Sequence, residues 1–128
     1  MPSAMRDQLE VAVSMDGYEA RMTQWGDMTV IFDEATAPAD PAPLFKGLPD
    51  DRCQCDHYGY VLDGEIVVRY ADSEEVIPAG AAYHIPPGHL PLIRSSAKTL
   101  EFTRTADLDK TMETVSKNIA AGAQPLQL

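Results

Sequence analysis

The 128-residue sequence predicts an all-β domain: a closed barrel or sandwich of short antiparallel strands with one α-helix near its C-terminus. Three observations predict this class. Apolar and polar side chains alternate along most of the first two-thirds of the chain, which is the period of a strand. Turn residues interrupt that alternation about every 8–12 positions. One apolar stripe at helical spacing, from Leu108 to Ile119, follows the last strand.

The composition is that of one folded domain over residues 1–128. Hydrophobic residues make up 45% of the chain, and the formal net charge is -10, with no cluster of Lys and Arg. An acidic surface repels phosphate backbones and anionic lipids, so we expect neither nucleic acid nor membrane as a partner. No apolar run reaches the about 18 residues of a membrane span, and the first residues lack the apolar core of a secretory signal. We therefore expect a cytoplasmic protein with reduced cysteines.

Residues 1–35 predict three N-terminal strands. The first runs from Leu9 to Met15 and ends at an Asp16-Gly17 hairpin turn. The second runs from Tyr18 to Trp25, and the third begins at Met28. Residues 36–51 then lose the alternation and contain four prolines, so they predict an extended surface loop.

Residues 52–104 predict the core of the barrel. The expected strands are separated by turns at Asp63-Gly64, Asp72-Ser73, Ala79-Gly80 and Pro86-Pro87-Gly88. Residues 107–121 predict the helix, with Asp107 as its N-cap and Gly122 just past its end. The tail from Ala123 to Leu128 is expected to be loose.

Two short motifs in this core resemble the cupin superfamily. Gly80, Pro86 and Gly88 reproduce a Gly-x5-Pro-x-Gly pattern, and the run from Tyr60 to Glu65 is similar to the end of the first cupin motif. A His-x-Gly-Tyr-Val stretch and Pro-Pro-Gly-His bring the chain closer to a subgroup of small bacterial cupins. The resemblance implies a double-stranded β-helix, a jelly-roll cupin barrel with a ligand cavity inside. It also implies a homodimer and a small-molecule ligand.

In the cupins that this chain resembles, the metal site usually consists of two histidines, a glutamate and a third histidine. This sequence has a different residue at each of those four positions. The matching positions hold Asp51, Cys53, His57 and Pro91. The usual histidine-glutamate site is therefore not carried over. Asp51 follows another aspartate after Pro49, which favours a polar turn.

A different set of metal ligands takes its place. Cys53, Cys55 and His57 alternate, so on a strand all three side chains share one face. His89 has the parity of the third histidine position and is the fourth candidate. Two thiolates and two imidazoles form a tetrahedral set for a divalent metal, zinc in the first place, with iron or copper as alternatives. The competing interpretations are buried cysteines that only fill space, a His57 hydrogen-bonded to Asp51 or Asp56, and a redox pair.

Three functions follow from these residues. The first is a metal-dependent enzyme acting on a small molecule, with His57 or Tyr58 available for proton transfer. The second is a non-catalytic binding or sensing domain, with or without metal. The third is a structural barrel whose interior is filled by side chains. His84 is expected on the surface or in a hydrogen bond, outside the site.

Overall fold

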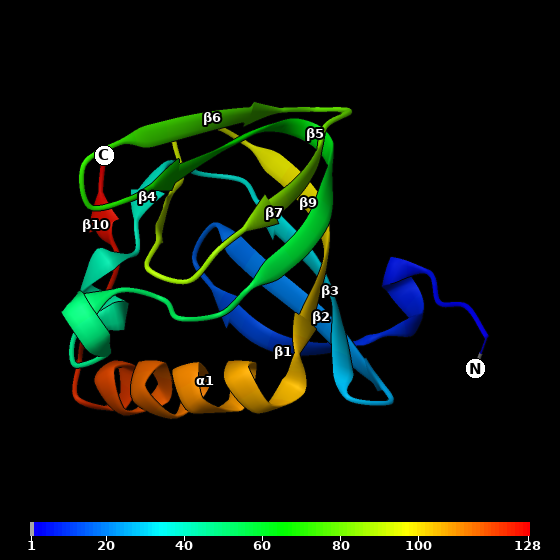
Figure 1. Ribbon diagram of the computed structural model, residues 1–128, viewed down its shortest axis with the longest axis horizontal. Coiled ribbons are helices and arrows are strands. Elements are labelled where there is room, and N and C mark those ends of the chain that lie inside the picture. The colour runs from blue at the N-terminus through cyan, green and yellow to red at the C-terminus, as the bar shows by residue number, and fades with distance from the viewer. Residues whose placement is uncertain (1) are drawn as a thin grey trace.

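The alternating segments form an antiparallel jelly-roll barrel in the computed structural model, which describes residues 2–128 (Figure 1). One helix, α1 (Thr105–Ala120), lies across one side of it. The strands of the barrel, in chain order, are β1 (Glu10–Met15), β2 (Tyr18–Trp25), β3 (Met28–Ala35), β5 (His57–Arg69), β6 (Glu74–Pro78), β7 (Ala82–Ile85), β8 (Leu90–Leu92) and β9 (Ala97–Arg104).

β5 connects two parts of the barrel. Its first half pairs with β7 and β9, and β9 continues the sheet through β3 and β2 to β1. Its second half pairs instead with β6 and β8. The inward faces of both parts enclose the interior of the barrel, which is the space available for a site.

The change of partners takes place at Asp63 and Gly64, where the sequence predicts a hairpin turn. That prediction is wrong, because the chain continues through these residues as one strand. The register with β9 shifts between Val61 and Asp63, and Gly64 has a φ of 74°. A Cβ on Gly64 would lie 2.1 Å from the carbonyl oxygen of Ser96. Glycine is therefore needed for a bend in which β5 leaves one part of the barrel and enters the other.

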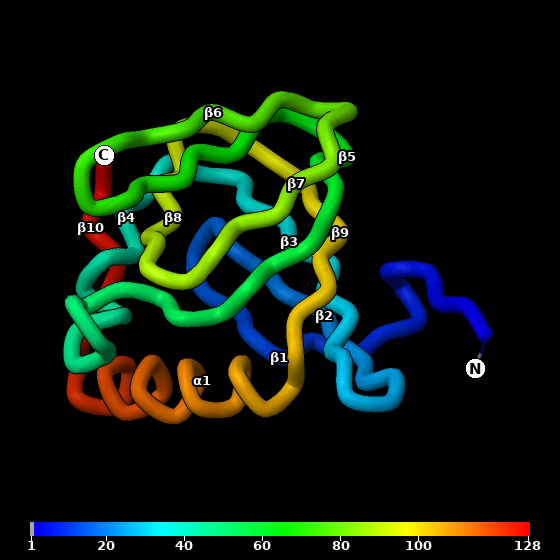
Figure 2. The backbone as a smooth tube through the Cα atoms, in the orientation of Figure 1, coloured from blue at the N-terminus to red at the C-terminus, as the bar shows by residue number. Residues whose placement is uncertain are grey.

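The proline-rich segment is more ordered than the loop that the sequence predicts. It contains β4 (Ala39–Asp40) and two short 3-10 helices, η2 (Ala42–Phe45) and η3 (Pro49–Asp51). The C-terminal tail is not loose either, because β10 (Leu126–Gln127) pairs with β4. Figure 2 shows these two segments side by side at the end of the molecule opposite the N-terminus. A two-residue strand carries no periodicity, so only the tertiary contact identifies it.

The helix begins earlier than predicted and has a different N-cap. It continues directly from β9, so Arg104 takes the cap position without a side-chain hydrogen bond. Asp107 lies in the first turn, where a carboxylate interacts favourably with the helix dipole. The predicted end is confirmed: Gly122 has a φ of 97°, and its N–H donates to the carbonyl of Ile119.

The apolar stripe of α1 packs against the sheet. Leu108 packs with Ala20 and Ile31 of the sheet, and Met112 adds to this cluster. The other core cluster consists of Val61, Val68, Ile77 and Ile85, from β5, β6 and β7. Within residues 2–128, no helix has the length and apolar character needed to cross a bilayer.

Candidate functional site

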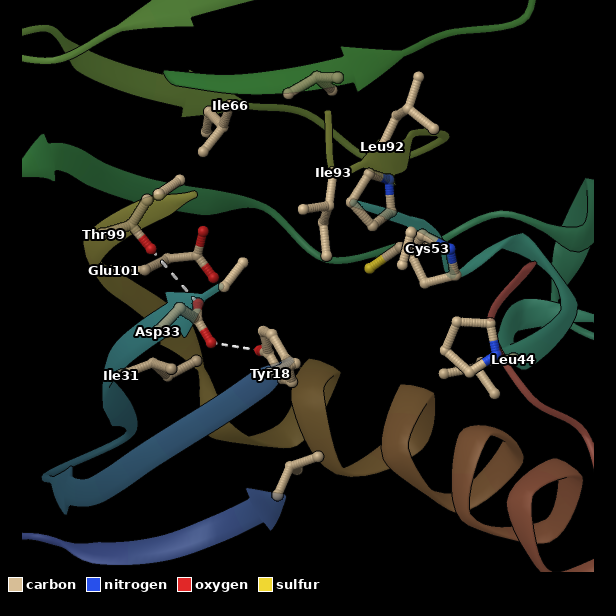
Figure 3. Close-up of a pocket in the computed structure, with 18 of the residues that line it drawn as sticks. Tyr18, Ile31, Asp33, Leu44, Cys53, Ile66, Leu92, Ile93, Thr99 and Glu101 are labelled. Atoms are coloured by element: carbon tan, nitrogen blue, oxygen red, sulfur yellow. Dashed lines mark hydrogen bonds between the residues drawn. The ribbon is translucent and has the colours of Figure 1, made fainter. Parts of the chain in front are cut away.

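The barrel encloses a cavity of about 280 Å³ between the sheet and α1. Its walls divide into a polar end and an apolar end (Figure 3). Tyr18, Asp33, Thr99 and Glu101 gather at one side of the view, with Ile31 and Ile66 beside them, and Leu44, Leu92 and Ile93 lie at the other. The sulfur of Cys53 points into the space between them. The interior is therefore not filled by side chains, and it presents titratable groups.

Cys53, Cys55 and His57 come together on the wall of this cavity. One possible ligand atom from each, two Sγ and a ring nitrogen, all lie within 4.8 Å of one another. The predicted strand over Cys53 is wrong, because β5 begins only at His57. An isolated bridge to His89 fixes the segment instead: the N–H of Cys53 donates to the His89 carbonyl at 2.9 Å. Both cysteines are buried and free of any disulfide.

Two side chains of β9 fix the orientation of the His57 ring. Its Nδ1 lies 2.7 Å from the Thr103 hydroxyl and 3.1 Å from the Glu101 carboxylate. Because a carboxylate only accepts hydrogen bonds, Nδ1 carries the proton that is shared with it. The other nitrogen, Nε2, then faces the Sγ of Cys53 at 3.6 Å. The expected partners Asp51 and Asp56 are not the ones the structure shows.

His89 lies next to His57 in the same wall. It is 4% exposed, and the two rings meet edge to face with centroids 4.9 Å apart. Its Nδ1 lies 2.7 Å from the carbonyl oxygen of Pro86, which can only accept, so this nitrogen carries the proton. Nε2 of His89 therefore keeps its lone pair. The structure brings His89 beside the cysteine-histidine cluster, although it is not one of the three residues whose ligand atoms converge.

The protonation of these groups is strongly perturbed. Burial would lower the pKa of His57, but the adjacent Glu101 carboxylate outweighs it and raises that pKa to about 9. Burial and the positive charge of His57 lower the pKa of His89 to about 4. The hydrogen bond between the two thiols lowers the pKa of Cys55 to about 7 and raises the pKa of Cys53. One sulfur thus ionises easily while the other holds its proton.

The site residues predicted from the sequence do not include a chain of hydroxyl and carboxyl groups at the polar end. Tyr18 donates a hydrogen bond to Asp33, and Tyr83 donates to Glu101 at 2.8 Å. Burial and the charge of Glu101 raise the pKa of Asp33 to about 7. A signal was present, because Thr99, Glu101 and Thr103 alternate along one face of β9.

Gly59 allows Tyr83 to reach Glu101. A Cβ on Gly59 would lie 2.5 Å from the Tyr83 hydroxyl oxygen. Any larger residue would therefore displace the ring from its contact with the carboxylate. This close approach joins β5, β7 and β9 at the polar end of the cavity.

The remaining candidates lie outside the cavity. Tyr58 is 48% exposed on the outer face of β5, where its ring stacks on His84. Its alternation with His57 turns it away from the cavity, so Tyr83 is the tyrosine of this region that lines the wall. His84 is hydrogen-bonded to Asp56 at 2.8 Å, as its surface assignment predicts. Asp51 is exposed and accepts the N–H of Gly47, so it belongs to a polar turn.

Comparisons with known proteins give structural neighbours only. No protein-family model matches the sequence, and no curated protein matches it. An RmlC-like cupin from Shewanella frigidimarina superposes with a TM-score of 0.59 at 15% identity, over 84% of this chain and 93% of that chain. The Clostridium difficile EutQ protein gives 0.58 at 14% identity, over 80% of this chain and 78% of that one.

A third neighbour contains iron. The Fe(II) form of HppE superposes with a TM-score of 0.54 at 17% identity, over 78% of this chain and 58% of that chain. At such identities the likeness concerns the architecture of the barrel and no particular residue. With the jelly-roll topology and the cavity described above, it establishes that the chain has the cupin fold.

Proposed function

We propose that this protein binds a divalent metal ion, zinc in the first place, through Cys53, Cys55 and His57, with His89 as the fourth ligand. The convergence of three ligand atoms within 4.8 Å carries the proposal. Thiolate and imidazole are the ligands that zinc favours in tetrahedral sites. Iron and copper are the alternatives for the same donors.

The distance between the sulfur of Cys53 and the Nε2 of His57 fits such an ion. Zinc lies about 2.3 Å from a sulfur and about 2.05 Å from an imidazole nitrogen. At a tetrahedral angle those bonds separate sulfur and nitrogen by about 3.6 Å. The observed separation of Cys53 Sγ and His57 Nε2 is 3.6 Å. The pair is thus already spaced for one shared ion.

The hydrogen bonds behind the two histidines support the same assignment. A metal-binding histidine usually donates its other ring N–H to a carboxylate or a carbonyl. His57 donates to Glu101, and His89 donates to Pro86. In both rings the hydrogen bond occupies Nδ1, so Nε2 is the nitrogen that would bind an ion, at His57 once the ring has lost its second proton.

The cavity beside the cluster supports binding of a small molecule and, as a further step, its chemical conversion. A bound divalent ion would supply Lewis acidity at this wall. Glu101 would keep the His57 ring oriented, and Asp33 offers a carboxyl with a pKa of about 7 that can hold or release a proton near neutral pH. The aliphatic walls of the cavity would exclude water from that exchange.

A metal-free binding domain is the second candidate. One observation favours it: the thiol of Cys55 has a neutral partner, the hydroxyl of Thr111 at 3.3 Å, so the cluster is hydrogen-bonded without an ion. The two candidates differ in the metal content of the purified protein.

The test is elemental mass spectrometry on untagged protein, before and after incubation with zinc and removal of the excess. The variants are Cys53→Ser, Cys55→Ser and His57→Ala, and His84→Ala is the matched control because it removes a histidine outside the cavity. We expect stoichiometric metal in the wild type and His84→Ala, and loss of metal in the other three. A folded wild type that takes up no metal on reconstitution would exclude the metal site and favour the second candidate.

A further inference from the structure

We propose that the ligand of the cavity is a small amphiphilic amine, with its protonated amino group at the Asp33 and Glu101 end and its apolar body against the aliphatic end. The inference names the ligand class for the proposed function and rests on the cavity being a ligand site. It does not depend on the metal ion.

The side chains that line the cavity are more acidic than basic. Four carboxylate residues line it: Asp16, Asp33, Glu65 and Glu101. No lysine and no arginine is among the lining residues from the described part of the chain. An anionic ligand would meet carboxylates with no fixed cation other than a protonated imidazole, and the one beside Glu101 is already paired. Burying an unpaired anion there would carry a large desolvation cost.

Hydrogen-bond accounting leads to the same conclusion. The hydroxyl protons of Tyr18 and Thr99 are directed to Asp33, and that of Tyr83 is directed to Glu101. These donors are therefore used within the wall. What remains for a ligand is the second lone pair of each carboxylate and hydroxyl oxygen, which can only accept.

His89 adds an independent sign that the cavity takes a donor. Its side chain is 4% exposed and lines the cavity, and its Nδ1 is used by the Pro86 carbonyl. Among residues 2–128, no hydrogen bond reaches its Nε2. This lone pair is therefore available to a ligand donor or an ion in the cavity.

The other end of the cavity fits a hydrocarbon group. Its walls include Leu44 of η2, Leu92 of β8 and the adjacent Ile93 (Figure 3). Ile31 and Ile66 lie instead on the side of Asp33 and Glu101. The volume of about 280 Å³ is near the lower limit of ligand pockets, which span about 300–1,000 Å³. A short alkyl or aryl chain with one amino group matches this division.

The experiment compares three probes of equal chain length: hexylamine, hexan-1-ol and hexanoate. Binding is measured at pH 7.5 by calorimetry and by NMR shift changes, on metal-free and zinc-loaded protein. We expect hexylamine to bind at least about tenfold more tightly than the alcohol, since a charged hydrogen bond adds about 1.5–3 kcal/mol. Hexanoate is expected to bind more weakly than either.

Variants then test where the amino group binds. Asp33→Asn is expected to weaken hexylamine binding about tenfold and to leave hexan-1-ol binding unchanged. Asp72→Asn, in an exposed turn, is the matched control and should change neither. Circular dichroism confirms that each variant is folded.

The inference would be overturned by hexanoate binding as tightly as hexylamine, or by hexylamine binding that Asp33→Asn leaves unchanged. Binding that occurs only with zinc present would also overturn it, because the amino group would then be on the ion. Metal content is measured on the same samples. Amine binding without metal uptake would support the inference and exclude the metal site. Metal uptake without amine binding would exclude the inference and support the metal site.

Discussion

The Nδ1 of His57 lies 3.1 Å from the Oε2 of Glu101, and this contact joins β5 to β9, the last strand of the barrel. His57 begins β5, whereas Glu101 lies in the middle of β9, more than forty residues later. The carboxylate accepts the Nδ1 hydrogen bond of the ring and raises its pKa to about 9. It therefore controls how readily Nε2 can bind an ion.

Replacing this carboxylate tests its role. In Glu101→Gln the amide oxygen still accepts the Nδ1 hydrogen bond, but the charge is lost, so zinc affinity measured above about pH 9, where the wild-type His57 has lost its extra proton, should fall about 10-fold to 100-fold. The pKa of His57 in metal-free protein should fall from about 9 to below its ordinary 6.5, because burial then dominates. Chelator competition measures the affinity, and an NMR titration measures the pKa. Glu113→Gln on the exposed face of α1 is the control, and equal affinities for the two variants would contradict the prediction.

Asp33 should make the protein less stable as the pH rises. Its pKa is raised from 3.8 to about 7 in the folded state, so ionisation is costlier in the fold than in the unfolded chain. The cost is absent below pH 3.8, grows between the two pKa values and is complete above about pH 7. This loss of stability is at most about 4 kcal/mol, because a tenfold change in a proton-binding constant corresponds to about 1.36 kcal/mol.

The substitution Asp33→Asn removes that cost. We expect it to raise the free energy of unfolding by about 2 kcal/mol at pH 8 and by much less at pH 4. Urea denaturation at both pH values measures the difference. The exposed Asp72→Asn should show no such dependence, and a gain in Asp33→Asn that does not vary with pH would refute the assignment.

The core cluster predicts a contrast between two valines. Val61 is fully buried in the core, whereas Val76 is 46% exposed on β6. Val61→Ala should lower the free energy of unfolding by about 2 kcal/mol, because it removes buried methyl groups and leaves a cavity. Val76→Ala should change it by less than about 0.5 kcal/mol. Thermal and urea unfolding provide the measurement, and a similar loss in both variants would count against a core centred on Val61.

The bend in β5 predicts a contrast between two glycines. Gly26 and Gly64 both have a positive φ, but a Cβ on Gly26 meets nothing within 4 Å, whereas one on Gly64 would lie 2.1 Å from the Ser96 carbonyl oxygen. Gly26→Ala should cost about 1 kcal/mol, the backbone strain alone. Gly64→Ala should cost several kcal/mol more, or prevent folding, because the two backbones must separate. Equal stabilities of the two variants would show that the close approach does not exist.

Periodicity determined much of the fold from the sequence. The alternation before Asp16 and after Tyr18 predicts β1 and β2, and the stripe from Leu108 to Ile119 predicts α1, because one-sided burial leaves a mark of period 2 or 3.6 in the chain. The glycine-proline motifs predict turns, since positive φ and a missing N–H are local properties. The alternation of Cys53, Cys55 and His57 identified these residues as candidate ligands, but their convergence depends on the bridge to His89, because a strand would hold Cys53 and His57 about 13 Å apart.

The tertiary structure decided what depends on distant partners. The sequence cannot show that Asp63 and Gly64 form a bend within one strand, because the neighbouring β9 and β6 decide whether the chain turns back. Nor can it show that β10 pairs with β4. The polar end of the cavity also depends on tertiary contacts. Asp33 and Glu101 lie on separate strands, and each carboxylate becomes buried only when the barrel closes around it. Local spacing determined which residues are available to bind a metal, and closure of the barrel decided the charge, the shape and the partners of the cavity that they face.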